Sequence, residues 1–165
     1  MIDFSQYFQL ARDISTPRSR GAPRKVHLRR AISTAYYGLF HCLSDWATCA
    51  LVGESPARRK TPDFRLVYRS FQHGEMRSAC EQAGRPLPPE FGIKMFCPEL
   101  RFCASTFVEL QKRRHEADYD PHAEIVLSDA QDAVAGAETA AENLRIAPED
   151  QRVLFLLTLR YKHRP

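Results

Sequence analysis

The feature that most constrains the fold of this chain is an apolar pattern of helical period that runs from about Arg24 to Leu51. Apolar or small residues return every third or fourth position in two neighbouring rows, which together form a wide apolar face. At about 1.5 Å per residue, the predicted helix is about 40 Å long. The rows contain Leu28, Ile32, Ala35, Leu39, Cys42 and Trp46, and Ser33, Tyr36, Phe40, Leu43 and Ala47.

Further helical patterns lie on both sides of this long helix, separated by proline and glycine. No apolar alternation of period two, which would indicate a strand, is left over. The sequence therefore predicts an all-α fold in one domain over residues 1–165, an up-and-down helical bundle of four long helices plus one or two short helices. Its core covers about residues 24–145. The other helices are expected over about residues 3–14, 62–74, 75–83, 98–120, from 128 onward, and 148–162.

Local signals refine the ends of these helices. Thr61 and Pro62 read as the N-cap and first residue of one helix, and Ser128 with Gln131 reads as a capping box for another. Residues 15–23, which include Arg18 and Arg20, are expected to form a loop. The irregular connection 85–98 is expected to pack its apolar residues onto the body, and it leaves the packing order of the helices open.

Composition excludes several classes of protein. The chain has 165 residues, a net charge of +4 and no apolar run approaching the ~20 residues that span a bilayer. The N-terminus does not resemble a secretory signal. The five cysteines form no Cys-x-x-Cys pair, so neither a disulfide framework nor a zinc site is expected. These features predict a cytoplasmic protein without a membrane partner, and the mild positive charge alone does not establish nucleic-acid binding.

Motifs for cofactors and metals are also absent from the sequence. There is no Gly-rich phosphate loop, no His-Glu-x-x-His and no Glu-x-x-His pair of the kind that holds two irons in a bundle. No metal site and no cofactor are therefore predicted.

A polar row interrupts the apolar face of the long helix. Ser33, Tyr37, His41 and Asp45 are each four residues apart and so share one face. Such a row can orient or relay protons. Alternatively, these groups satisfy one another or the backbone at the edge of the core.

A second polar group lies at the end of the helix that precedes Pro121. Helical spacing places Arg114 over Asp118, and His115 over Tyr119. Arginine can hold a phosphate, histidine can transfer protons near neutral pH, and tyrosine can stack on a base. Metal-free RNA cleavage needs groups of these kinds. The alternative is a solvated helix end with local ion pairs, each contributing little to stability.

Two sequence blocks together resemble bacterial HEPN-domain proteins. The first, over residues 29–41, contains Ser-x-Ala-Tyr-Tyr-x-x-Phe-His, and the second, over residues 113–121, contains Arg-x-x-Ala-Asp-Tyr-Asp-Pro. The resemblance covers about residues 24–145. It implies a helical bundle that forms a homodimer. It also implies kinship with metal-independent endoribonucleases of toxin–antitoxin, abortive-infection and CRISPR systems, and with HEPN proteins that only bind nucleotides, RNA or a protein partner.

The two blocks contain the candidate site residues. The Arg/His/Tyr cluster at the end of the later helix makes Arg113, Arg114, His115, Asp118 and Tyr119 the candidates for catalysis, and the block on the long helix offers Arg29, Arg30, Ser33, Tyr37 and His41 as candidates for binding. The nuclease members carry an arginine followed four to six residues later by histidine. Here Ala117 stands at the histidine position when the blocks are aligned on Tyr119.

Three functions are therefore considered. The first expectation is a non-catalytic HEPN-type module that binds RNA, a nucleotide or a protein, in a toxin–antitoxin or phage-defence setting, where a nucleotidyltransferase-type protein would be the partner. The second is a metal-independent endoribonuclease with a non-standard Arg/His site. The third is a structural helical bundle without a ligand.

Overall fold

A computed structural model describes residues 3–17 and 23–160 of the chain. These residues form seven α-helices and two short 3₁₀ turns and contain no strand, which confirms the predicted all-helical class. Three helices are short, rather than the expected one or two. The elements are α1 Phe4–Ser15, α2 Lys25–Val52, η1 Arg58–Lys60, α3 Pro62–Arg69, α4 His73–Gln82, η2 Pro89–Phe91, α5 Pro98–Tyr119, α6 Leu127–Ile146 and α7 Glu149–Thr158.

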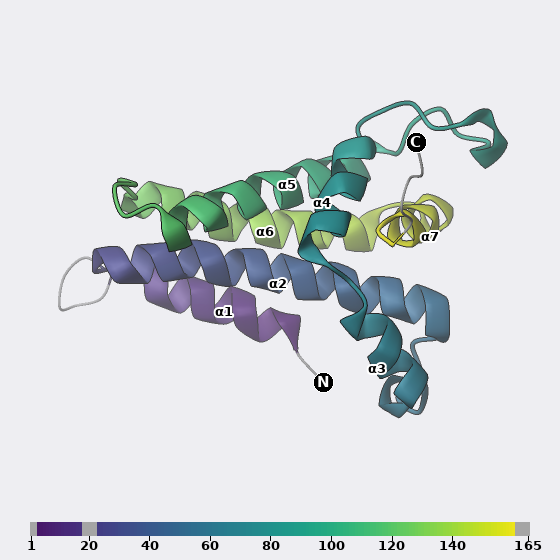
Figure 1. Ribbon diagram of the computed structural model, residues 1–165, viewed down its shortest axis with the longest axis horizontal. Coiled ribbons are helices and arrows are strands. Elements are labelled where there is room, and N and C mark those ends of the chain that lie inside the picture. The colour runs from purple at the N-terminus through teal and green to yellow at the C-terminus, as the bar shows by residue number, and fades with distance from the viewer. Residues whose placement is uncertain (1–2, 18–22, 161–165) are drawn as a thin grey trace.

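The long helix α2 lies at the centre of the molecule, in contact with α1, α5 and α6 (Figure 1). The chain reverses its direction between successive long helices, from α1 to α2, from α2 to α5 and from α5 to α6 (Figure 1). This alternation places the N-terminal half of α2 beside the C-terminal end of α5. The two sequence blocks singled out above are thereby brought side by side.

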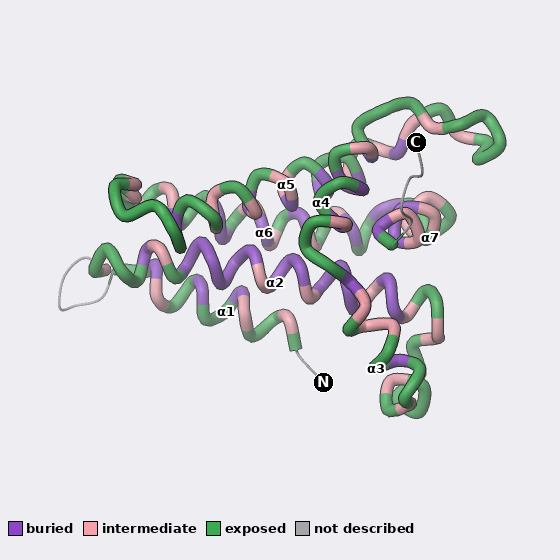
Figure 2. The backbone as a smooth tube through the Cα atoms, viewed as in Figure 1, coloured by how far each residue is buried: buried purple, intermediate pink, exposed green. Residues whose placement is uncertain are grey.

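Burial explains why α2 takes this central position. Both apolar rows predicted for it are buried, except for the half-buried Trp46 (Figure 2). The side of α6 that faces α2 and α5 carries alanines at helical spacing, and small side chains allow helices to approach closely. Gly38 serves the same purpose toward α1, since a Cβ atom there would lie 2.5 Å from Cε1 of Phe8.

Helix ends follow the capping signals in part. Oγ1 of Thr61 accepts a hydrogen bond from the backbone N–H of Phe64, as expected for an N-cap. The capping box expected at Ser128 is wrong, because the N-cap of α6 is Val126, two residues earlier, and the helix begins at Leu127. The carboxylate of Asp129 instead accepts the N–H of Val126 at 2.8 Å. Valine has no side-chain acceptor, so only this half of a capping box exists.

The connection between α4 and α5 only partly meets expectation. Phe96 is buried and packs edge-to-face on Phe155 of α7, with ring centroids 5.6 Å apart. The middle of the connection projects away from the bundle, and Phe91 at η2 is 44% exposed (Figure 1). Gly92 terminates η2 with a left-handed φ of 70°, which reverses the chain there. Phe91 therefore does not pack onto the body, whereas Leu87 and Ile93 of the same connection do, as expected.

Two further expectations reach outside the described residues. The loop predicted over residues 15–23 overlaps the end of α1 at Ser15, while Arg18 and Arg20 lie outside the described residues. The C-terminal helix was expected to reach residue 162, but α7 ends at Thr158 and residues 159 and 160 form a turn, while the remaining expected residues lie outside the described part. Within the described residues no helix is long and apolar enough to cross a membrane.

Candidate functional site

No hydrogen bond joins the members of the polar row of α2 to one another, so the row forms no proton relay; of the expected backbone contacts, the hydroxyl of Ser33 lies 3.3 Å from the carbonyl oxygen of Arg29. Each member instead bonds to a different partner outside α2. Ser33 and Tyr37 reach α5, His41 reaches α3, and Asp45 reaches η1. The row is therefore a set of polar contacts that dock three later elements onto the central helix.

The first two contacts belong to one cluster, which we call the Arg114 cluster and which consists of Ser33, Tyr37, Arg114, Asp118 and Tyr119. Nη2 of Arg114 donates to the hydroxyl of Tyr37 at 2.9 Å. Its Nε lies 2.8 Å from Oδ2 of Asp118 but makes no hydrogen bond, so this contact is an ion pair with poor N–H alignment. The hydroxyl of Ser33 donates to Oδ1 of the same carboxylate.

Two aromatic rings complete the Arg114 cluster. The guanidinium carbon of Arg114 lies 5.5 Å from the ring centroid of Tyr37 and 5.3 Å from that of Tyr119. Both distances are within the range of cation–π attraction. The side chain of Arg114 stays 23% exposed, and Tyr119 is 63% exposed. A fixed cation thus meets solvent beside an accessible aromatic ring.

The geometry of the Arg114 cluster follows from two helical spacings. Arg114 and Asp118 are one turn apart on α5, as are Ser33 and Tyr37 on α2. Because α2 and α5 are antiparallel neighbours, the two pairs face each other. The predicted ion pair of Arg114 with Asp118 and the ring contact of His115 with Tyr119, at a centroid distance of 4.9 Å, are both present.

Next to the Arg114 cluster lies a second group, the histidine cluster, formed by Tyr36, His41, Tyr68 and His73. Nδ1 of His73 is 2.6 Å from the hydroxyl of Tyr36, and Nδ1 of His41 is 2.8 Å from that of Tyr68. The ring of His73 also lies 5.9 Å from the ring of Tyr37, which links the two clusters. Sequence reasoning missed His73, since it comes from α4 and belongs to neither sequence block.

Partial desolvation shifts the pKa values of the side chains in the histidine cluster. The pKa of His41 is lowered mainly by desolvation and, to a smaller extent, by the charge of the neighbouring His73. The pKa of His73 is lowered mainly by desolvation and, to a smaller extent, by the positive charge of Arg114. Desolvation also raises the pKa of Tyr68 to about 12 and raises that of Tyr36 further. At neutral pH both histidines are therefore mainly neutral and both phenols keep their protons.

These shifts predict a loss of stability in mild acid. Unfolded histidine has a pKa of about 6.5, so below that pH the unfolded chain takes up protons that folded His41 and His73 resist. The free energy of unfolding should fall as the pH decreases from about 6.5 toward the lowered pKa values of the folded protein. Urea unfolding at pH 7.5 and pH 5.5 measures the change. The double variant His41→Asn/His73→Asn should lose less stability than the wild type between these two pH values. An equal loss would show that His41 and His73 do not cause the pH dependence.

The structure separates the candidate arginines. The guanidinium of Arg29 donates to the backbone carbonyls of Ala117, Asp120 and Ala123, at 3.0, 2.8 and 2.7 Å, and so binds the chain at the end of α5. Arg113 donates to the carbonyl of Asp129 at 2.6 Å and faces α6. Neither joins the Arg114 cluster.

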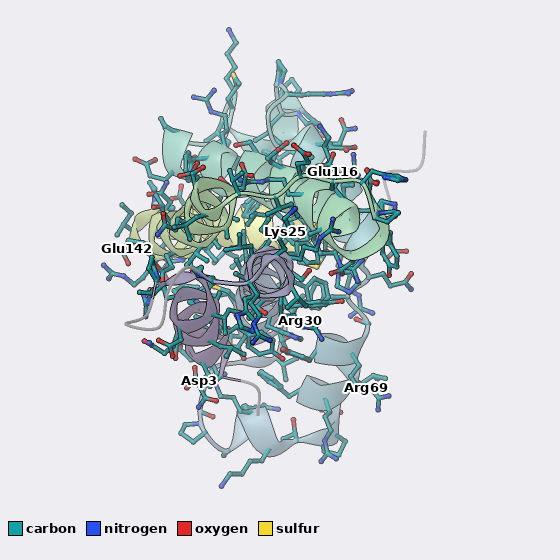
Figure 3. The ribbon with its side chains drawn as sticks, turned by 90° about the vertical axis from the view of Figure 1, so that its left-hand side faces the viewer. Asp3, Lys25, Arg30, Arg69, Glu116 and Glu142 are labelled. Carbon is teal, nitrogen blue, oxygen red and sulfur yellow. The ribbon has the colours of Figure 1, made fainter. Side chains whose placement is uncertain are left out.

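Arg30 and His115 are exposed. Arg30 lies one turn before Ser33 on α2, and its side chain has no polar partner among the described residues. Figure 3 shows the molecule end-on. On one side of α2 lie α5 and α3, and Arg69 is labelled on α3. On the opposite side lie α1 and α6, where Asp3 and Glu142 are labelled. The Arg114 and histidine clusters lie between α2 and the helices of the first side.

Residues for a metal are not assembled in the described part of the chain, where no three His, Cys, Asp or Glu side chains lie together as a metal site requires. Comparison of the whole sequence and structure with protein-family models, curated proteins and solved structures finds no match. The resemblance to HEPN-domain proteins therefore stays a prediction from the two sequence blocks.

Proposed function

We propose that this protein is a non-catalytic HEPN-type module that binds single-stranded RNA at the Arg114 cluster. The observation that carries the proposal is the position of Arg114, a partly exposed guanidinium held against two tyrosine rings. Such an arginine can pair with a phosphate, and an accessible tyrosine ring can stack on an unpaired base. The up-and-down, HEPN-like topology is part of the same proposal.

The surroundings of Arg114 support a single strand better than a duplex. Tyr119 and His115 are both exposed at the end of α5, where a base could stack. Arg30 adds a second exposed cation on the neighbouring helix. The ion pair with Asp118 offsets part of the charge of Arg114. We therefore expect modest affinity that relies on stacking as well as on phosphate contacts.

Titration of a labelled single-stranded RNA tests this function directly. Fluorescence anisotropy at 50, 100 and 200 mM salt should show binding that weakens as salt increases, because phosphate contacts release counterions. Binding without salt dependence would contradict a phosphate contact. If no RNA binds at 50 mM salt, the RNA-binding proposal is wrong. The remaining functions are then binding of a protein partner and a purely structural role.

RNA cleavage is a second candidate function, favoured by the position of His73. Its lowered pKa keeps the imidazole neutral, and in the tautomer whose Nδ1–H donates to Tyr36, Nε2 carries the lone pair of a base. That nitrogen could take the proton of a ribose 2′-hydroxyl while Arg114 holds the phosphate. The 2′-oxygen would then displace the 5′-oxygen, which takes a proton from water. Arg113, expected to share this work, faces α6, and the ring of His115 contacts that of Tyr119.

Incubation with tRNA in EDTA decides between binding and cleavage. The non-catalytic module predicts that the RNA stays intact while it binds. Fragments that are lost in both His73→Asn and Arg114→Ala, but persist in His115→Asn, would support the second function. Fragments that persist in all three variants would indicate a contaminating nuclease.

The remaining partner assignments come from the resemblance alone. They are a homodimer, a nucleotidyltransferase-type partner and a role in a toxin–antitoxin or phage-defence system. The molar mass of the purified protein by light scattering tests the first, with a value of twice 18.9 kDa expected for a dimer.

A further inference from the structure

The hydrogen bonds around His73 determine which of its two ring nitrogens carries the proton. A neutral imidazole has a proton on one nitrogen and a lone pair on the other, so the two nitrogens have opposite roles. Nδ1 of His73 lies 2.6 Å from the hydroxyl of Tyr36. Either this hydroxyl donates to Nδ1, which places the proton of His73 on Nε2, or Nδ1–H donates to the hydroxyl. The surroundings of Tyr36 decide between the two arrangements.

The burial of Tyr36 is the first constraint. The residue is only 1% exposed, so its O–H group cannot donate to bulk water and needs an acceptor within the protein. Among the described residues, two groups can form a hydrogen bond with this hydroxyl, namely Nδ1 of His73 and the side-chain amide of Gln111. One of these two groups must therefore accept the proton of the hydroxyl.

The amide of Gln111 acts as a donor and not as an acceptor. Its Nε2 donates to the backbone carbonyl of His73 at 3.2 Å, and because a carbonyl oxygen can only accept, this contact fixes which way the amide faces. Desolvation raises the pKa of Tyr36, whereas Gln111 lowers it, as a hydrogen bond donated to the phenol oxygen does. Oε1 of Gln111 is buried and has no hydrogen-bond partner. The hydroxyl of Tyr36 therefore donates to Nδ1 of His73.

We propose that Gln111 and Tyr36 hold His73 in the tautomer with its proton on Nε2, and that Nε2–H donates a hydrogen bond to a phosphate of the bound RNA. His73 is exposed, and its ring has no hydrogen-bond partner other than Tyr36 among the described residues, so Nε2 is accessible to a ligand. Tyr36 and Gln111 are positioning residues, because they act only through His73. The phosphate in this inference rests on the proposed function, whereas the tautomer does not.

The position of His73 next to Arg114 suits a phosphate. The ring centroid of His73 lies 5.9 Å from that of Tyr37, and the hydroxyl of Tyr37 accepts the hydrogen bond from Nη2 of Arg114. Arg114 supplies positive charge there, and the neutral imidazole supplies a directed N–H donor. In this tautomer Nε2 has no lone pair, so it cannot take the proton of a ribose 2′-hydroxyl. The inference therefore favours binding over RNA cleavage.

The ¹⁵N NMR spectrum of the histidine rings tests the tautomer in the protein without RNA. At pH 8 the signals of His73, assigned by their absence in His73→Asn, should show the proton on Nε2. Tyr36→Phe removes the hydroxyl and should give the averaged shifts of a tautomer mixture. The matched control Tyr37→Phe removes a hydroxyl that binds Arg114 and should leave the tautomer of His73 unchanged. A proton on Nδ1 in the wild type, or no change in Tyr36→Phe, would overturn the proposal.

Two amide substitutions of His73 test whether Nε2 contacts the RNA. A glutamine can place its amide nitrogen near the position of the imidazole Nε2, whereas an asparagine reaches only the position of Nδ1. His73→Gln should therefore bind labelled single-stranded RNA within about twofold of the wild type. His73→Asn should bind it about tenfold more weakly, as expected for the loss of a hydrogen bond to a charged group.

Equal RNA affinities of His73→Gln and His73→Asn would overturn the donor role of Nε2. If neither variant nor the wild type binds RNA, the proposed function is wrong and the phosphate contact with it. The spectrum of the protein without RNA still decides the tautomer in that case, so the two failures are distinguishable.

Discussion

Replacing Arg114 with alanine should weaken the binding of single-stranded RNA by about tenfold to a hundredfold. A hydrogen bond to a charged group contributes about 1.5–3 kcal/mol, which corresponds to this range. The variant removes the cation that lies against Tyr37 and Tyr119, and with it the ion pair with Asp118. Asp118 then adds unpaired negative charge beside the phosphate, so the loss is expected near the upper end. Fluorescence anisotropy at 50 mM salt measures it.

Arg113 provides a matched control for this experiment. It is the preceding residue on the same helix and carries the same charge, but its guanidinium binds the carbonyl of Asp129 on the α6 side. Arg113→Ala should therefore leave RNA affinity within about twofold of the wild type. In a plot of the logarithm of the binding constant against the logarithm of the salt concentration, the slope should decrease in magnitude by about one in the Arg114 variant. In the Arg113 variant this slope should not change. Equal losses in the two variants would indicate a diffuse charge effect rather than a site.

Replacing Phe107 with alanine should lower the free energy of unfolding by about 3–5 kcal/mol. Large-to-small changes of a buried phenylalanine remove its transfer free energy and leave a cavity. Phe107 is fully buried on α5 and its ring lies 5.5 Å from that of Tyr36 on α2. Because a domain of this size is stable by only about 5–15 kcal/mol, this single change would remove a large share of its stability.

Phe102 serves as the control for this prediction. It lies on the same helix but is 41% exposed. Phe102→Ala should change the free energy of unfolding by about 0.5 kcal/mol or less, as surface substitutions usually do. Urea denaturation of both variants measures the difference. Similar destabilisation by the two substitutions would contradict the packing of α5 against α2.

The fold was largely predictable because it depends on periodicity. The apolar rows of α2 and the inner row of α5 specify which faces are buried, and proline marks the starts of α3 and α5. The N-cap of α6 was misplaced by two residues, at Ser128 instead of Val126, because valine has no capping side chain that the sequence could reveal. The exposure of Phe91 was missed because the sequence of a loop does not show whether an apolar residue in it packs against another part of the protein.

The candidate site was predictable only in part. The spacing of Arg114 with Asp118 follows from one helix, so it could be read directly. Consecutive residues on a helix point about 100° apart, and which arginine of the pair at 113 and 114 faces α2 depends on the packing of α5. The backbone role of Arg29 and the arrival of His73 from α4 depend on tertiary contacts across many residues, for which the sequence carries no local signal.

The most direct test of the central claim is the Nε–Hε NMR resonance of each arginine during titration with single-stranded RNA. The resonance of Arg114, assigned by its absence in Arg114→Ala, should shift progressively as RNA is added and return when salt is raised. The resonance of Arg113 should stay in place. An unmoved Arg114 resonance, at RNA concentrations that saturate binding, would contradict the account and place the RNA elsewhere on the protein.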